Sequence, residues 1–147
     1  MSSLHKEPLS KSLDEAHDEY QRMQLSLLFY RPRGLVLAAI RAAYHDSTWD
    51  WEKCDGCTGV SELHFPKGYR FPPCVMHDHK CELARRAPTW RDHCNARAHG
   101  DELFLLANQD YCVNPARCIL RYHGVRLYWL FWRRWVERRA RKRERRM

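Results

Sequence analysis

Residues 73–86 read PCVMHDHKCELARR and contain the two adjacent side chains from which a function can be argued. We expect a helix over this segment, with a break at Pro88. His77 and Asp78 are neighbours, so on a helix their side chains project about 100° apart. The imidazole can therefore handle a proton while the carboxylate holds a cation.

The segment before this helix, residues 47–73, is expected to be a long structured loop. It is rich in residues that break helices: Gly56, Gly59, Gly68, Pro66, Pro72 and Pro73. The loop Asp55-Gly56-Cys57-Thr58-Gly59 can bring a second carboxylate and backbone carbonyls to the cation that Asp78 holds. Ligation by oxygen alone suits a hard ion such as Ca²⁺. The sequence therefore predicts a loop of the calcium-binding type.

A second helix is expected on the other side, over about residues 97–111. Asp101 on this helix can accept a hydrogen bond from the far nitrogen of His77, and such a bond fixes the imidazole tautomer and orients the base. We therefore expect two antiparallel helices that carry His77 and Asp101. The other histidines, including His79 and His93, have no further candidate catalytic or metal-binding residues at a recognisable spacing, and are interpreted as ordinary polar residues.

Three further segments have a helical pattern, and no strand pair is found. They are residues 11–30, residues 35–44 and a long final helix from Pro115 onward, with a break at residues 31–34. The predicted fold class is therefore all-α. The expected organisation is an N-terminal helical segment (1–46), a central domain with the candidate site (47–132) and a basic C-terminal tail (133–147).

Positive charge is concentrated in the tail. The chain has 26 Lys and Arg residues against 18 Asp and Glu residues, and residues 133–147 alone contain nine basic and two acidic residues. The rest of the chain is nearly neutral, which argues against a surface built as a whole to bind nucleic acid. The tail can contact anionic lipid, nucleic acid or an acidic partner protein, and the sequence does not choose among them.

Seven cysteines is a high and odd number for 147 residues. In an exported chain they suggest disulfides with one thiol left over, and in a reducing compartment they suggest a metal site. Cys54 and Cys57 have the spacing of a zinc knuckle, and Cys74, His77 and Cys81 lie on one stripe of a helix. Four of these five residues can close a tetrahedral Zn²⁺ site, which is the alternative to Ca²⁺.

Four motifs occur in a fixed order along the chain. They are Asp55-Gly56-Cys57-Thr58, Pro66-x-Gly68-Tyr69-x-Phe71, Cys74-x-x-His77-Asp78 and Asp101-x-x-Phe104. Together they resemble the prokaryotic and fungal type of secreted phospholipase A2, over roughly residues 50–120. Each motif alone is weak, and the ordered set is more specific than any member.

The resemblance implies a Ca²⁺-dependent hydrolase that cleaves the sn-2 ester of glycerophospholipids. His77 matches the general base that takes a proton from the attacking water, and Asp101 matches the carboxylate that orients it. Asp78, Asp55 and the carbonyl of Gly56 match the ligands of the catalytic Ca²⁺, which would polarise the ester carbonyl and stabilise the oxyanion.

The resemblance also implies a disulfide between Cys57 and Cys74 and a second between Cys112 and Cys118. The family usually has an aromatic residue where this chain has Cys81. We expect Cys81 to pair with Cys94 instead, which leaves Cys54 as the odd thiol. The expected fold is thus a small helical domain stapled by disulfides.

The segment 126–135 is rich in aromatic residues flanked by arginine. Trp129, Trp132 and Trp135 suit the headgroup region of a phospholipid membrane, where a lipid hydrolase needs a docking surface. The alternative is that this segment forms the core-facing stripe of the last helix through Leu127, Leu130, Phe131 and Trp135. Both interpretations stay open.

We expect neither a leader nor a membrane-spanning segment. Residues 1–20 are polar and lack the apolar core of a signal peptide. The apolar stretch 25–40 contains Arg31, Pro32 and Arg33, so it is not expected to cross a bilayer. An extracellular or particle-associated location is favoured, because a particle such as a virion would deliver a membrane-active enzyme without a leader.

Two other classes of function remain. One is a catalytically silent structural or virion-associated protein that keeps this fold and binds other subunits of a particle. The other is a small zinc-binding module whose basic tail contacts nucleic acid.

Overall fold

The computed structural model describes residues 13–50 and 71–146, with side chains from Tyr20 onward. The elements are α1 (Leu13–Tyr30), α2 (Gly34–His45), α3 (Pro72–Arg85), α4 (Trp90–Asp110), α5 (Pro115–Tyr128), the π-helical turn η4 (Trp129–Arg133) and α6 (Arg134–Arg146). All of them are helical, which confirms the predicted all-α class for the described residues. None of these helices combines the length and the apolar character needed to cross a membrane.

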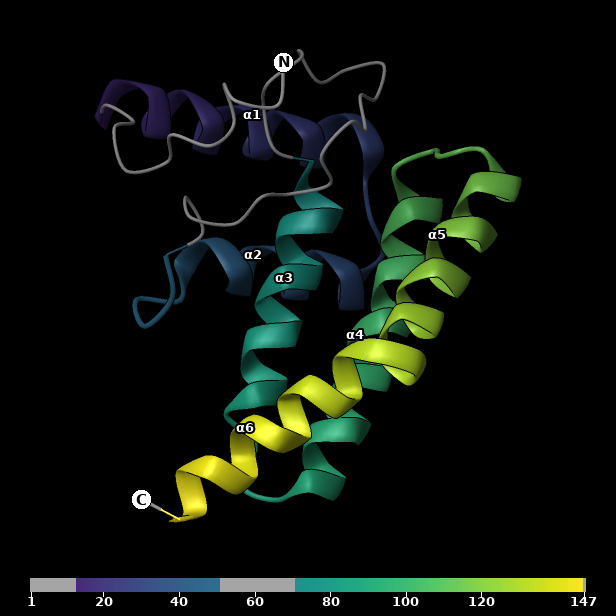
Figure 1. Cartoon of the computed structure of the whole chain (residues 1–147). Coiled ribbons are helices and arrows are strands. Elements are labelled where there is room, and N and C mark those ends of the chain that lie inside the picture. The colour runs from purple at the N-terminus through teal and green to yellow at the C-terminus, as the bar shows by residue number, and fades with distance from the viewer. Residues whose placement is uncertain (1–12, 51–70, 147) are drawn as a thin grey trace.

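The centre of the fold is an antiparallel hairpin of α3 and α4 (Figure 1). The helix α2 packs against this hairpin, α1 crosses its upper end in the view, and α5 runs back along α4. Gly100 of α4 lies so close to α3 that a Cβ at this position would be 2.8 Å from Cβ of Lys80. The two helices therefore touch almost backbone to backbone one residue before Asp101.

The helix α4 begins at Trp90, seven residues before the predicted start. Thr89 is its N-cap, and its hydroxyl accepts a hydrogen bond from the backbone N–H of Asp92 at 3.1 Å. The apolar periodicity that predicted this helix begins only in its second half, because its first turns face α6 with polar and charged side chains. The cap was therefore a better signal of the boundary than the periodicity.

The break between α1 and α2 lies where the sequence predicts it. Arg31 adopts a left-handed backbone with φ of 47°. The backbone N–H and the guanidinium of Arg33 donate hydrogen bonds of 2.8 to 3.0 Å to the carboxylate of Asp110. The left-handed backbone of Arg31 thus turns the chain. Arg33 then links the start of α2 to the end of α4.

The core lies between α2 and the α3–α4 hairpin, with α1 as a lid. Its members are buried apolar side chains from all four helices, among them Met23, Val36, Ile40, Ala43, Val75, Met76, Leu103, Phe104, Ala107 and Tyr111. The same hairpin that contributes half of these residues also carries His77 and Asp101. The hydrophobic core therefore fixes the relative position of the two candidate catalytic side chains.

The tail of the chain is a docked helix. The predicted single helix from Pro115 onward is divided into α5 and α6 by the π-helical turn η4. The side chain of Arg141 in α6 donates hydrogen bonds to the carbonyl oxygens of Arg85 and Ala87, at the closed end of the α3–α4 hairpin. Figure 1 shows α6 lying across this end of the hairpin.

The expected Cys112–Cys118 disulfide is not formed, and that prediction is wrong. Both residues are free thiols. Cys112 is exposed and has φ of 58°, whereas Cys118 is buried and its Sγ donates a hydrogen bond to the carbonyl oxygen of Val113 at 3.4 Å. The two sulfur atoms occupy different environments, so the sequence spacing alone was misleading.

The expected Cys81–Cys94 disulfide is also wrong, because both residues are free thiols. The sulfur of Cys81 is directed toward His77, 3.9 Å from its Nε2 atom. Burial raises the pKa of Cys94 although the arginines of α6 act to lower it, so this thiol lies near α6. Cys74 is disulfide-bonded, and its predicted partner Cys57 lies outside the described residues.

Candidate active site

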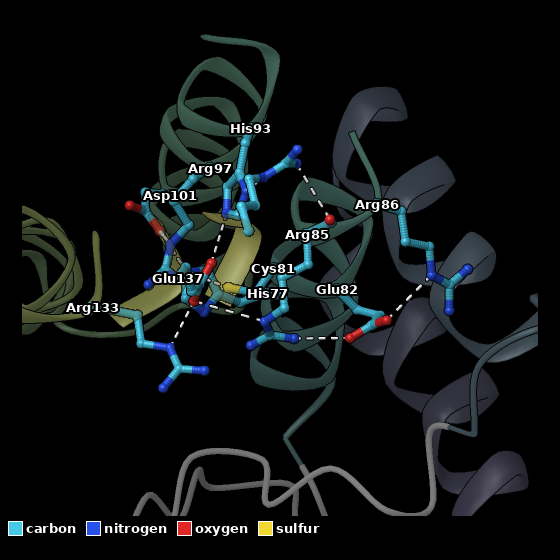
Figure 2. Close-up of polar contacts among 11 residues, drawn as sticks. His77, Cys81, Glu82, Arg85, Arg86, His93, Arg97, Asp101, Arg133 and Glu137 are labelled. Carbon is cyan, nitrogen blue, oxygen red and sulfur yellow. Dashed lines mark hydrogen bonds and ion pairs between the residues drawn. The ribbon is translucent and has the colours of Figure 1, made fainter. Parts of the chain in front are cut away.

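The α3–α4 hairpin brings His77 and Asp101 into contact. Nε2 of His77 lies 2.6 Å from Oδ1 of Asp101, and both residues are buried (Figure 2). The ring of Phe104 lies 4.6 Å from the ring of His77, centroid to centroid. The imidazole is therefore held in one orientation by a hydrogen bond on one edge and an aromatic ring on its face.

Asp101 is ionised although it is fully buried. Burial acts to raise its pKa, but the hydrogen bond with His77 and the positive charges of Arg97 and Arg126 outweigh burial and hold the pKa below its ordinary value. Nε of Arg97 lies 3.3 Å from Oδ1, and Nη1 of Arg126 lies 2.8 Å from Oδ2. The side chains of His77, Arg97 and Arg126, which come from α3, α4 and α5, thus hold this one carboxylate in place.

Among the described residues, His77 makes its hydrogen bonds through one ring nitrogen, Nε2. Burial acts to lower its pKa, but the hydrogen bonds with Asp101 and Cys81 outweigh burial and raise the pKa to about 9. In the described part of the chain Nδ1 of His77 has no hydrogen-bond partner, and the side chain of His77 is 10% exposed. Because Nε2 bonds Asp101, Nδ1 is the ring nitrogen left to bind a water molecule.

The predicted calcium ligands are described only in part. Asp78 follows His77 on α3 and is half-buried, whereas Asp55 and Gly56 lie outside the described residues. The predicted donors are carboxylate and carbonyl oxygens, and this donor set fits Ca²⁺. Within residues 13–50 and 71–146, no three His, Cys, Asp or Glu side chains are grouped so as to hold a metal. The calcium site therefore stays a prediction.

The zinc alternative is weakened by the chemistry of its proposed ligands. Zn²⁺ binds cysteine as a thiolate, and Cys74 is disulfide-bonded. Nε2 of His77, the nitrogen closest to Cys81, already bonds Asp101. The remaining proposed ligands, Cys54 and Cys57, lie outside the described residues.

Trp129 was predicted to contact a membrane, and this prediction is wrong. Its side chain is 1% exposed, its ring lies 5.5 Å from that of His93, and the guanidinium of Arg97 lies 5.0 Å from its centre. Trp132 and Trp135 are exposed, as a docking role requires. The alternative core-facing stripe fails as well, because Leu127, Phe131 and Trp135 all face solvent.

The interpretation of His79 and His93 as ordinary polar residues is also wrong. Nε2 of His79 lies 2.9 Å from Oδ2 of Asp46, and Nε2 of His93 lies 2.6 Å from Oε1 of Glu137. Both rings are buried. Their carboxylate partners are 33 and 44 residues away in the chain, so no local spacing pointed to them.

Arg97 and Arg126 are the residues of the site that the sequence analysis missed. Arg97 lies one helical turn before Asp101, and this i, i+4 spacing was a usable signal. Arg126 comes from α5, 25 residues from Asp101, and no short-range pattern could have found it.

Comparison of the chain with protein-family models, with curated proteins and with solved structures gave no match.

Proposed function

We propose that this protein hydrolyses the sn-2 ester of glycerophospholipids by a Ca²⁺-dependent mechanism of the phospholipase A2 type. The observation that supports this proposal best is the buried contact between His77 and Asp101 on antiparallel helices, with Asp78 as the next residue of α3. A histidine oriented by a buried carboxylate is the arrangement that general-base catalysis requires.

The chain's own residues divide the work between them. Nδ1 of His77 takes a proton from the water that attacks the ester carbonyl, and returns it to the leaving alcohol. Asp101 accepts the hydrogen bond from Nε2, which fixes the tautomer and stabilises the imidazolium that forms. Arg97 and Arg126 hold Asp101 in place and keep it ionised, so they act as positioning residues.

Asp78 is the described residue that would hold Ca²⁺. When bound, Ca²⁺ supplies positive charge that polarises the ester carbonyl, stabilises the oxyanion and lowers the pKa of the nearby imidazole. The last effect matters here, because a base must be neutral before it can accept a proton, and the pKa of His77 without a cation is about 9.

The test is the Ca²⁺ dependence of hydrolysis of a soluble short-chain phosphatidylcholine. Asp78→Asn is expected to raise the Ca²⁺ concentration that gives half-maximal rate, because it removes a charged ligand. Asp101→Asn is expected to lower the rate at saturating Ca²⁺ and to leave the half-maximal Ca²⁺ concentration unchanged. A wild-type chain without hydrolysis at any Ca²⁺ concentration, or with a rate that chelation does not change, would contradict the proposal.

A further inference from the structure

The last helices of the chain present a large apolar surface to solvent. Phe131, Trp132 and Trp135 are 75%, 63% and 61% exposed, and Leu127 and Tyr128 are exposed beside them. We call these five residues the aromatic strip. A surface helix normally turns its polar side outward, and a contiguous group of exposed apolar side chains marks an interaction site.

The opposite side of the same helices is docked on the protein. Trp129, Arg133, Glu137 and Arg141 follow one another every fourth residue and therefore share one face. Trp129 and Glu137 are buried, Nε of Arg133 donates to Glu137 at 2.6 Å, and Nε of Arg141 donates to Nδ1 of His93 at 2.8 Å. These contacts fix the rotation of α6, so the aromatic strip faces away from the protein.

Beyond the aromatic strip, the exposed face continues as a row of cations. They are Arg139, Lys142, Arg145 and Arg146, all exposed. They follow Trp135 at three- and four-residue steps, so they share the side of the helix that carries the strip. Neither acid of α6 interrupts this side, because Glu137 is docked and Glu144 follows three residues after the docked Arg141. The outward side of α6 is therefore apolar at one end and cationic at the other.

We propose that this surface binds anionic phospholipid bilayers, with the aromatic strip in the interfacial region and the row of cations over the headgroups. Tryptophan, tyrosine and leucine bury their apolar parts at this depth, and arginine keeps its charge at the phosphates. The negative surface potential of an anionic leaflet attracts the row of cations. Binding itself does not require catalysis, but its purpose, the delivery of the active site to its substrate, rests on the proposed function.

Single-stranded nucleic acid is the competing partner, because bases stack on aromatic side chains beside basic residues. The composition of the surface favours lipid. Leu127 and Phe131 offer no polar group to a nucleotide, and the cations follow the aromatic strip along the helix instead of alternating with it. Sites that bind single strands are basic grooves, whereas this surface is the outward side of a docked helix.

The experiment is co-sedimentation of the full chain with vesicles of phosphatidylcholine alone or mixed with phosphatidylserine. Phe131→Ser/Trp132→Ser/Trp135→Ser is expected to weaken binding to the mixed vesicles at least about tenfold, because three apolar side chains no longer insert. Arg139→Gln/Lys142→Gln/Arg146→Gln is expected to weaken it about fivefold for each cation removed. Its remaining binding should depend less on salt.

The matched control is Leu28→Ser/Leu35→Ser, which removes two equally exposed apolar side chains from α1 and α2 and is expected to bind like the wild type. Circular dichroism checks that each variant is folded. Wild-type binding by the aromatic triple variant would overturn the proposal, and so would binding of a single-stranded RNA oligonucleotide in place of vesicles. His77→Ala is expected to bind vesicles normally, because His77 lies outside the docking surface. A wild-type chain that binds vesicles but does not hydrolyse them refutes the proposed function and leaves the docking surface standing.

Discussion

At the scale of single residues, Cys112 occupies a backbone position that suits glycine. The helix α4 ends in a Schellman motif, in which the N–H of Cys112 donates to the carbonyl of Gln109 and the N–H of Val113 donates to that of Asn108. Cys112 has φ of 58°, and a residue with a Cβ in this conformation costs about 1–2 kcal/mol. We expect Cys112→Gly to raise the free energy of unfolding by about 0.5–1 kcal/mol in urea denaturation, after the greater entropy of glycine in the unfolded chain is subtracted.

The control is Cys112→Ala, which removes the exposed thiol and keeps the Cβ. Its free energy of unfolding is expected to stay near that of the wild type. An equal gain in both variants would show that loss of the thiol, and not relief of the backbone, stabilises the protein.

At the scale of helices, Gly100 sets the distance between α3 and α4. A Cβ at this position would lie 2.8 Å from Cβ of Lys80, so a methyl group forces the two helices apart. We expect Gly100→Ala to lower the free energy of unfolding by about 1–3 kcal/mol, as overpacking of a tight contact does. Because Asp101 is the next residue, hydrolysis is also expected to fall while the variant is still folded.

Gly124→Ala provides the matched control for this substitution. Gly124 lies inside α5, and a Cβ there has no atom within 4 Å. Alanine is expected to stabilise this helix by up to about 1 kcal/mol, because glycine is the weaker helix former. If both alanine variants changed stability in the same direction, the close approach of α3 and α4 would not be the cause.

The docking of α6 depends on the charge of His93. Nδ1 of His93 accepts a hydrogen bond from Arg141, so the ring is neutral and Nε2 donates to Glu137. Burial lowers the pKa of His93, the bond to Glu137 acts to raise it, and the charges of Arg141 and Arg85 lower it further. Between this lowered pKa and the ordinary value of 6.5, the unfolded chain binds more protons, so the free energy of unfolding from this group falls as the pH falls.

The measurement is a titration of the histidine ring protons by NMR. His93 is expected to titrate below the ordinary histidine value of 6.5. Removal of the ring in His93→Gln is expected to reduce the loss of stability between neutral pH and about pH 5.5, a range that includes the ordinary pKa of histidine. A pKa of His93 above 6.5 would contradict the assigned tautomer and the docking contact built on it.

At the scale of the whole molecule, the sequence predicted the elements that local patterns specify. The helical hairpin and the contact between His77 and Asp101 followed from periodicity and from motif order, and the structure contains both. The sequence did not predict which side of the last helix faces the protein, because both sides carry apolar residues. Tertiary contacts such as those of Glu137 and Arg141 with His93 decide that Trp129 is buried and Trp135 is exposed.

Contacts between distant segments marked the limit of prediction. Arg126 reaches Asp101 from another helix, and its spacing along the chain has no period that links the two. The cysteine pairs failed for a related reason, since Cys112 and Cys118 are close in sequence but lie in an exposed turn and a buried helix face. Local spacing predicts which residues share a helix face, but tertiary packing decides which helix faces meet.

We propose His77 as the general base of a Ca²⁺-dependent phospholipase. The most direct measurement is release of the sn-2 fatty acid from phospholipid vesicles, with Ca²⁺ or with a chelator, by the wild type, His77→Ala and His99→Ala. The account predicts Ca²⁺-dependent release by the wild type and His99→Ala, and a rate at least about 100-fold lower for His77→Ala. Release by His77→Ala at the wild-type rate, or no release by a folded wild-type chain, would contradict it.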